Sequence, residues 1–430
     1  MNKFILSLVS LAFIQGGFQQ AMAQQSAADS VMNHAKGNRL SVGGYGEVAY
    51  SRNFYSDNVF KYFDPKKYKN DDSHGRFDIP HAVIYLSYDF GKGWKLGSEI
   101  EFEHGGTGTA YEREYEEGGE WESETEKGGE VELEQFWLQK TFSRAFNLRF
   151  GHIVVPVGLN NSHHEPLNFF TVYRPEGENT ILPSTWHQTG ASLWGNVGKF
   201  KYEVQFLEGL DAMQFDRDHW IQKGTHSAFE FEPASKYAVA GRLDWYALRG
   251  VRIGVSGYYG HSINNTLMND SKKELKGAVS IGSIDFTVNR NNWIVRGQAT
   301  YGHLGDAYSV KYLSGRSTQT SPYSSTEVGK NAVAIGVEAG YDVFSQIPKL
   351  RADNQKLYAF GRFDYYNPYV RDKKQSAYPY EEKKVMSLGL NYYPIRQIAV
   401  KFDYTKRFLK TPYNNEPAIN FGIAYEGFFL

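Results

Sequence analysis

Carboxylates at a spacing of two residues are the first feature of this 430-residue sequence that could perform chemistry. Glu99, Glu101 and Glu103 lie in one segment, and Glu132 and Glu134 lie in another. Two facing carboxylates can serve as a general acid and a general base. Residues spaced by two on a β-strand, however, follow one another along the same face. We therefore predict that these glutamates line a water-exposed wall and do not form a catalytic pair.

A second group, His163, His164 and Glu165, has the residue types of a metal site. Adjacent side chains point in different directions and no H-x-x-x-H spacing accompanies them, so we predict no metal ion there. Ser192 and His187 could belong to the nucleophilic machinery of a phospholipase. No G-x-S-x-G motif surrounds Ser192 and no acidic partner is identifiable. We therefore predict that the protein is not an enzyme and needs no cofactor.

The segments that carry these residues alternate between apolar and polar side chains, which is the period of a strand with two different faces. In residues 94–103, for example, Ile100 belongs to an apolar row and Glu99 to a polar row. Over residues 39–430 we count 16 such segments of about ten residues each, the length that a tilted strand needs to cross a membrane. The sequence therefore predicts an all-β protein, a 16-stranded antiparallel transmembrane β-barrel.

The connections between the segments alternate in length without exception. Short turns such as 91–93 and 142–145 alternate with long polar loops such as 104–130 and 154–186. Outer-membrane barrels have this arrangement, with short turns on the periplasmic side and long loops outside. We therefore expect the barrel to lie in an outer membrane, in contact with its lipid.

Aromatic residues gather at both ends of the predicted strands. Four of the eight tryptophans adjoin short turns: Trp94, Trp194, Trp245 and Trp293. The opposite strand ends carry Tyr50, Phe102, Phe206, Tyr259, Tyr301 and Tyr404. Because aromatic side chains concentrate at membrane–water interfaces, this distribution predicts two aromatic belts around the barrel. A soluble β-sandwich would not need them.

The N-terminus has the pattern of a signal peptide over residues 1–23. Lys3 precedes an apolar core at 4–13, and Ala21-Met22-Ala23 is a cleavage site of the A-x-A type. We expect 24–38 to be a short flexible arm before the barrel domain at 39–430. An arm of about fifteen residues leaves no room for the plug domain of a TonB-type transporter.

Composition excludes further classes of protein. The chain has no cysteine, so disulfides and thiolate metal sites are absent. Its 47 basic residues balance 48 acidic ones, which argues against a nucleic-acid partner.

The loop at 154–186 differs from the other long connections because it carries its own apolar side chains and three of the 14 prolines. A loop with apolar anchors such as Phe169 and Phe170 packs against other parts of a protein. We predict that it folds into the barrel and forms a constriction. The charged residues that we expect to face water there are Glu165, Arg174, Glu176 and Glu178.

Assigning faces by alternation places both signs of charge on the channel wall. The acidic glutamates named above line one side. The predicted basic pore-lining residues are Arg149, Lys201, Arg242, Arg252, Arg296, Arg362, Lys401 and Arg407, interspersed with Glu203, Asp244, Asp364 and Asp403. Opposed charges in a narrow lumen are only partly screened by salt, so we predict weak, salt-dependent ion selectivity.

Residues 133–161, LEQFWLQKTFSRAFNLRFGHIVVPVGLNN, resemble the phosphate-selective porin O and P family, because a strand pair there ends in a P-x-G turn that enters the long loop. Two upstream stretches, FDIPHAVIYLSYDF and WKLGSEIEFEHGG, add to the resemblance. The resemblance implies a 16-stranded outer-membrane channel that has an inward-folded third loop and assembles as a homotrimer. Phosphate selectivity in the family depends on clustered lumenal Arg and Lys. The resemblance does not extend to those positions, and the lumenal rows here hold both signs of charge.

The sequence therefore predicts a porin for the passive diffusion of small hydrophilic solutes and ions. Two alternatives stay open: an anion- or phosphate-selective porin, and a barrel that serves in adhesion or as a structural module.

Overall fold

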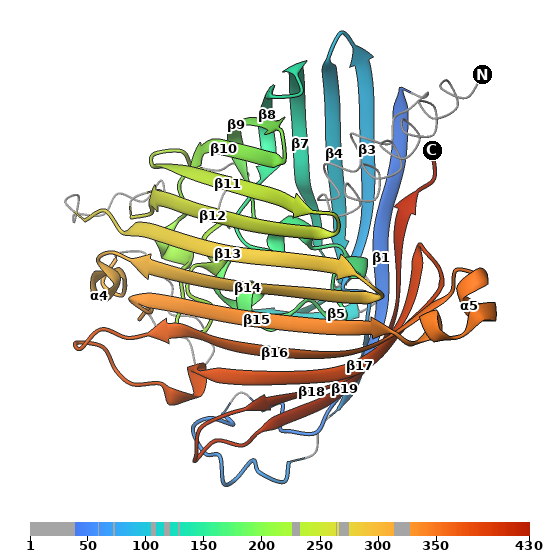
Figure 1. Ribbon diagram of the computed structural model, residues 1–430. Helices are drawn as coiled ribbons and strands as arrows, with labels where there is room; N and C mark the ends of the chain where they lie inside the picture. Colours follow the sequence, from blue (N-terminus) through green and yellow to red (C-terminus); the bar gives the residue numbers. More distant parts are fainter. Residues whose placement is uncertain are drawn as a thin grey trace, which may run out of the picture.

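The computed structural model describes residues 39–58, 60–71, 74–104, 109–115, 121–127, 130–225, 233–263, 265, 275–313 and 327–430. Each strand of the main sheet pairs in antiparallel fashion with its neighbours along the chain. The last strand, β19, also pairs with β1, so the sheet closes into a barrel (Figure 1). Closure leaves no row of unpaired backbone groups at an edge, as a sheet in a membrane requires. The predicted signal peptide and flexible arm lie outside the described residues.

Seventeen strand segments make up the barrel. They are β1 (Leu40–Asn53), β2 (Gly75–Asp78), β3 (His81–Gly91), β4 (Trp94–Glu103), β7 (Glu130–Ser143), β8 (Phe146–Val154), β9 (His187–Val197), β10 (Phe200–Glu208), β11 (Tyr237–Leu248), β12 (Val251–His261), β13 (Ala278–Arg290), β14 (Trp293–Leu304), β15 (Asn331–Asp342), β16 (Lys356–Val370), β17 (Lys383–Ile395), β18 (Ile398–Phe408) and β19 (Glu416–Phe428).

Two of these segments, β2 and β3, pair in succession with β1 and therefore act as one strand. They are separated at Pro80, which has no backbone N–H to donate to the sheet. The barrel thus has 16 strands, and the predicted fold class is confirmed.

Short turns and long loops alternate along the barrel, as predicted. Six connections, such as Lys92–Gly93 between β3 and β4, are two residues long. The seventh turn, between β15 and β16, holds η7 (Val343–Gln346) and α5 (Pro348–Ala352). In Figure 1, α5 lies at one end of the strands and α4 (Ala307–Val310), from a long loop, at the other. No helix among the described residues is both long and apolar enough to cross a membrane.

The long loops contain short elements that alternation did not predict. The loop after β4 includes a separate hairpin of β5 (Thr109–Tyr115) and β6 (Trp121–Lys127). Single helical turns occur in other loops: η5 (Ala212–Gln214), η6 (Gln222–Thr225) and η8 (Pro379–Glu381).

The two faces of the barrel wall differ as the sequence predicts. On β15, Ile335 and Val337 point outward and are exposed, whereas Ala334 and Glu338 are buried inside. The outer surface is apolar, and exposed aromatic residues mark both strand ends: Trp94, Trp245 and Trp293 at the short turns, and Phe102, Phe206, Tyr259, Tyr301 and Tyr404 at the loop side. An apolar outer band between aromatic girdles is the surface that a lipid bilayer covers.

Trp194 departs from this pattern, and its predicted place in the aromatic belt is wrong. Its indole Nε1–H donates to Oε1 of Gln139 at 3.0 Å, and Gln139 is buried inside the barrel. The reason is strand alternation: Trp194 shares the inward face of β9 with the buried Ser192.

Candidate channel constriction and lumenal charge

Loop L3, which we define as residues 155–186, connects β8 to β9. It contains η3 (Asn161–His163), η4 (Pro166–Asn168) and α3 (Glu176–Ile181). Its apolar side chains are nearly all buried: Val155, Val157, Phe169, Phe170, Val172, Ile181, Leu182 and Trp186 are at most 3% exposed. Burial of this apolar area supplies the free energy that orders a long loop. The loop is therefore part of the folded core.

Phe170 fixes one segment of loop L3 to the barrel wall. Its ring stacks on Phe360 of β16, with centroids 5.2 Å apart and an interplanar angle of 17°. It also covers Gly340 of β15, where an added Cβ would come within 2.5 Å of the ring. The missing side chain at Gly340 leaves the space that the phenyl ring occupies.

Strand β18 holds the backbone of the same segment. The Lys401 ammonium donates to the carbonyl oxygens of Phe169 and Thr171, each at 3.0 Å, and to that of Pro166. The backbone N–H of Val172 donates to Oδ2 of Asp403 at 2.7 Å. Lys401, predicted to line the pore, is instead buried under the loop.

Helix α3 is anchored by Glu176. Its carboxylate accepts from Nε of Arg407 on β18 at 2.7 Å and from the Tyr366 hydroxyl on β16 at 2.9 Å. Burial by itself would raise the pKa of Glu176. The charge of Arg407 and its hydrogen bond lower the pKa by more than burial raises it, so the net shift is downward. Glu176 therefore remains ionised and keeps the helix against this side of the barrel.

Further hydrogen bonds join loop L3 to other parts of the wall. Nη1 of Arg242 on β11 donates to the carbonyl of Gly158 at 2.9 Å, and the N–H of Gly158 donates to Ser256 on β12 at 3.1 Å. Nη2 of Arg174 donates to the Tyr45 hydroxyl on β1 at 3.1 Å. The loop therefore contacts strands on several sides of the barrel, among them β1, β11, β12, β16 and β18.

Burial divides the four charged residues predicted at the constriction. Arg174 and Glu176 line a cavity inside the barrel, which is described below, whereas Glu165 and Glu178 are 0% and 1% exposed. The expectation that these two glutamates face water is therefore wrong. The carboxylate of Glu178 accepts hydrogen bonds from the backbone N–H groups of residues 159–161 at 2.9–3.2 Å. Burial raises its pKa to about 7.

The basic residues on β11 and β12 are neutralised by neighbouring carboxylates. Arg242 contacts Asp244 at 2.8 Å and Asp285 at 3.0 Å, and Arg252 contacts the same two aspartates at 2.7 Å each. Asp285 lies on β13 and was not among the predicted wall residues, although strand alternation places it on the polar face.

A second paired group lies on β14, β15 and β16. Glu338 contacts Arg296 at 2.5 Å and Arg362 at 3.1 Å, and Arg362 also contacts Asp364 at 2.7 Å. We call these two groups together the paired wall. Its arginines each face at least one carboxylate, so the side predicted to be mixed or basic carries compensated charge.

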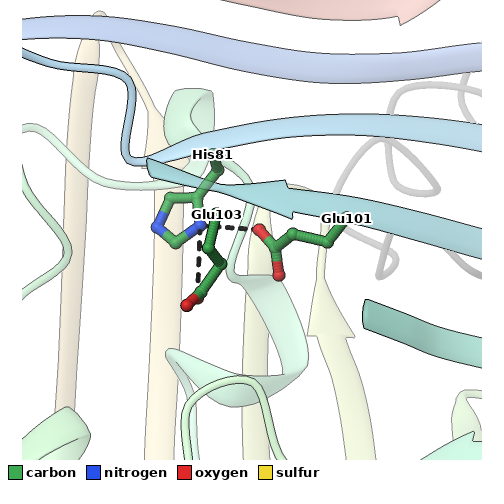
Figure 2. Close-up of side chains that lie close together, drawn as sticks. All are labelled: His81, Glu101 and Glu103. Atoms are coloured by element: carbon green, nitrogen blue, oxygen red, sulfur yellow. Dashed lines mark hydrogen bonds and ion pairs between the residues drawn. The ribbon is translucent and has the colours of Figure 1, made fainter. Parts of the chain in front are cut away.

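The opposite side, on β3, β4 and β7, is acidic, and we call it the acidic wall. Glu99, Glu101 and Glu134 are each 1% exposed, whereas the side chains of Glu103 and Glu132 are 28% and 31% exposed. Figure 2 shows His81 beside Glu101 and Glu103: Nδ1 lies 2.6 Å from Glu101 and 3.8 Å from Glu103. Glu101 thus has a histidine at hydrogen-bond distance, and Nη2 of Arg174 from loop L3 lies farther away, at 3.9 Å.

The two other predicted basic residues lie among aromatic rings. The Arg149 guanidinium lies 4.6 Å from the centre of the Trp137 ring, and its Nε donates to Gln139 at 3.2 Å. Nζ of Lys201 lies 5.8 Å from the centre of the Trp194 ring. Such contacts keep the two cations on the inner wall between the acidic and paired walls.

Ser192 and His187 do not form a nucleophile–base pair in the described residues. The Ser192 hydroxyl donates to Glu203 at 2.7 Å, and Nδ1 of His187 lies 2.6 Å from Nε2 of His152. Each side chain therefore has a different partner.

A cavity of about 620 Å³ remains between loop L3, β1 and β16–β19. Among the residues that line it, Lys61, Lys383 and Arg407 are basic, and Glu176, Asp364 and Glu416 are acidic. The interior thus offers a polar space with both signs of charge.

No family model matches the chain, so the resemblance to the porin O and P family stays a hypothesis. An uncharacterized protein of Aquifex aeolicus (strain VF5) is 27% identical over 394 residues, which are 91% of this chain and 80% of that protein. Among solved structures, a loop L8 deletion mutant of OmpT, an outer membrane protein of Vibrio cholerae, is 12% identical with a TM-score of 0.49, covering 91% of this chain and 100% of that chain.

A second structure, the outer membrane channel DcaP of Acinetobacter baumannii, is 10% identical with a TM-score of 0.49, covering 90% of this chain and 97% of that chain. Similarities this low carry no information about function. The class of the protein follows from its own architecture: a closed barrel with an apolar, aromatic-girdled exterior and a charged interior is an outer-membrane β-barrel.

Proposed function

We propose that the protein is a porin, which forms a water-filled channel for passive diffusion of small hydrophilic solutes and ions. The observation that carries this proposal is the polar cavity of about 620 Å³ between loop L3 and the wall. A barrel that served only in adhesion would not need a hydrated interior with charged groups of both signs.

Loop L3 is the proposed constriction, with Arg174 and Glu176 at its lumenal surface. Its contacts with strands on several sides of the barrel support this role, because they hold the loop across the interior. Single-channel conductance in planar bilayers tests both statements. The intact protein should conduct, and deletion of 168–179 should raise its conductance. A correctly folded protein without conductance would favour the adhesion alternative.

Weak ion selectivity is proposed over a preference for phosphate. Arg242, Arg252 and Arg296 face carboxylates at 2.5–3.0 Å, so they do not form the uncompensated basic ladder that anion selection requires. The reversal potential in a KCl gradient should be small and should decrease at high salt. Strong anion selectivity, with block of chloride current by low phosphate, would favour the phosphate-selective alternative.

Assembly as a homotrimer and export through the predicted signal peptide belong to the same proposal and rest on the resemblance and on the N-terminal sequence. Mass measurement of the detergent-solubilised protein would test the trimer, and N-terminal sequencing of the mature protein would test cleavage before Gln24.

A further inference from the structure

We propose that Glu99, Glu134 and His164 bind a divalent transition-metal ion, which joins loop L3 to the acidic wall. One ligand atom from each of the three side chains lies within 4.8 Å of the other two, and all three residues are buried. Glu99 comes from β4, Glu134 from β7 and His164 from loop L3. One imidazole nitrogen and two carboxylate oxygens are donors that suit Zn²⁺ and similar ions.

The buried carboxylate of Glu134 is the main evidence for a bound cation. It is 1% exposed, neither of its carboxylate oxygens has a hydrogen-bond partner among the described residues, and Nε2 of His187 comes no closer than 3.9 Å to Oε1. Glu99 and Glu101 lie close enough to repel its negative charge. A buried carboxylate without a donor and beside two others is costly. An ion between Glu134 and Glu99 would compensate both charges.

A β-bulge aims Glu134 at this position. Glu99 pairs with Gln135 and Ile100 pairs with Leu133, so Glu134 is the extra residue on β7. Glu134 and Gln135 are consequently both buried inside the barrel, although they are adjacent in sequence. Bulges redirect side chains in this way and are frequent beside functional sites. Gln135 then donates to Glu99, which orients the second proposed ligand.

The orientation of His164 also fits metal binding. Its Nδ1 lies 3.0 Å from the carbonyl oxygen of Asn161, which can only accept a hydrogen bond. Nδ1 therefore carries a proton, and Nε2 points toward Glu99 at 3.4 Å. A histidine that binds a metal through one nitrogen usually donates from the other to such an oxygen.

The neighbouring cluster of His81, Glu101 and Glu103 in Figure 2 is a weaker candidate. Nδ1 of His81 lies 2.6 Å from Oε1 of Glu101, so these two side chains already form a hydrogen bond with each other. We therefore assign the ion to the cluster that contains Glu134. The site differs from the sequence motif of adjacent residues 163–165, since only His164 takes part.

The experiment is a calorimetric titration of Zn²⁺ into the full-length mature barrel, folded in detergent and freed of metal with a chelator. The wild-type protein should bind about one equivalent. Glu134→Gln and His164→Gln should each weaken Zn²⁺ binding at least about tenfold. Two matched controls, Glu132→Gln and His163→Gln, change neighbouring residues of the same type and should bind as the wild type does.

Heat-dependent gel mobility checks that each variant is folded, and His164→Gln tests the site independently if Glu134→Gln does not fold. Absence of saturable Zn²⁺ binding by the wild type at neutral pH would overturn the proposal, because Glu134 would then be neutralised by a shared proton. An equal loss of affinity in the control variants would overturn it too. Binding requires the folded barrel and not conduction, so the result is independent of the proposed porin activity.

Discussion

The paired wall and the acidic wall differ in how their buried charges are compensated. On the paired wall, Arg242 and Asp285 come from different strands and compensate each other at 3.0 Å. On the acidic wall, the carboxylate of Glu134 accepts no hydrogen bond among the described residues. Nε2 of His187 lies 3.9 Å from its Oε1. The difference teaches that equal numbers of charges in the sequence do not imply equal compensation along the lumen.

The largest expected effect comes from breaking the paired wall with Arg242→Ala. This change would leave two aspartates, Asp244 and Asp285, with Arg252 alone, and would remove the hydrogen bond to Gly158. We expect the free energy of unfolding to fall by about 4 kcal/mol. Urea-dependent unfolding in lipid vesicles measures it. Arg290→Ala, at an exposed position, is the control, and an equal loss there would remove the distinction between compensated and solvated arginines.

A pH-dependent effect is expected where loop L3 faces the paired wall. Burial raises the folded-state pKa of Glu178 from its ordinary 4.5 to about 7. The protonated group therefore stabilises the fold fully below pH 4.5, and this contribution is lost as the pH rises to about 7. The change amounts to about 3 kcal/mol.

Comparison of stability at pH 4.5 and pH 8 in the wild type and in Glu178→Gln isolates this contribution, since other titrating groups are common to both proteins. The variant should show a smaller decline with rising pH. Equal declines in the two proteins would mean that the hydrogen bonds from residues 159–161 keep Glu178 ionised throughout.

An intermediate effect is expected from Arg407→Ala, which releases α3 from the wall. Loss of the charged hydrogen bonds to Glu176 should lower the free energy of unfolding by about 2 kcal/mol and raise single-channel conductance. Lys406→Ala, adjacent in sequence on the opposite face of β18, is the matched control. Unchanged conductance in the folded variant would show that this ion pair does not position the constriction.

The smallest effect has the opposite sign and lies on the acidic wall. In the presence of a chelator, Glu134→Gln should raise the free energy of unfolding by about 1 kcal/mol, because it removes a buried charge whose oxygens accept no hydrogen bond among the described residues. Glu132→Gln, at a partly exposed position, should leave it unchanged. Destabilisation by Glu134→Gln in metal-free protein would mean that the two walls are equally compensated.

Prediction of this protein from its sequence succeeded where one local rule was sufficient. Alternation with period 2 located the strands, and the lengths of the connections located the turns. Two features escaped the prediction for different reasons. The bulge at Glu134 breaks alternation and shifts the parity of β7. Trp194 obeys alternation and points inward, although its residue type and its place near a strand end suggested an interfacial belt.

The sequence by itself determined the barrel, because strand periodicity and turn spacing are properties of neighbouring residues. Only the tertiary structure decided the contents of the lumen. Arg242 meets Asp285 and Lys401 meets Phe169 across 43 and 232 residues of chain. The first contact depends on the register of β11, β12 and β13, and the second depends on the path of loop L3. The burial of Glu178 also depends on the path of loop L3, because the backbone N–H groups that donate to its carboxylate come from residues 159–161, near the start of the loop.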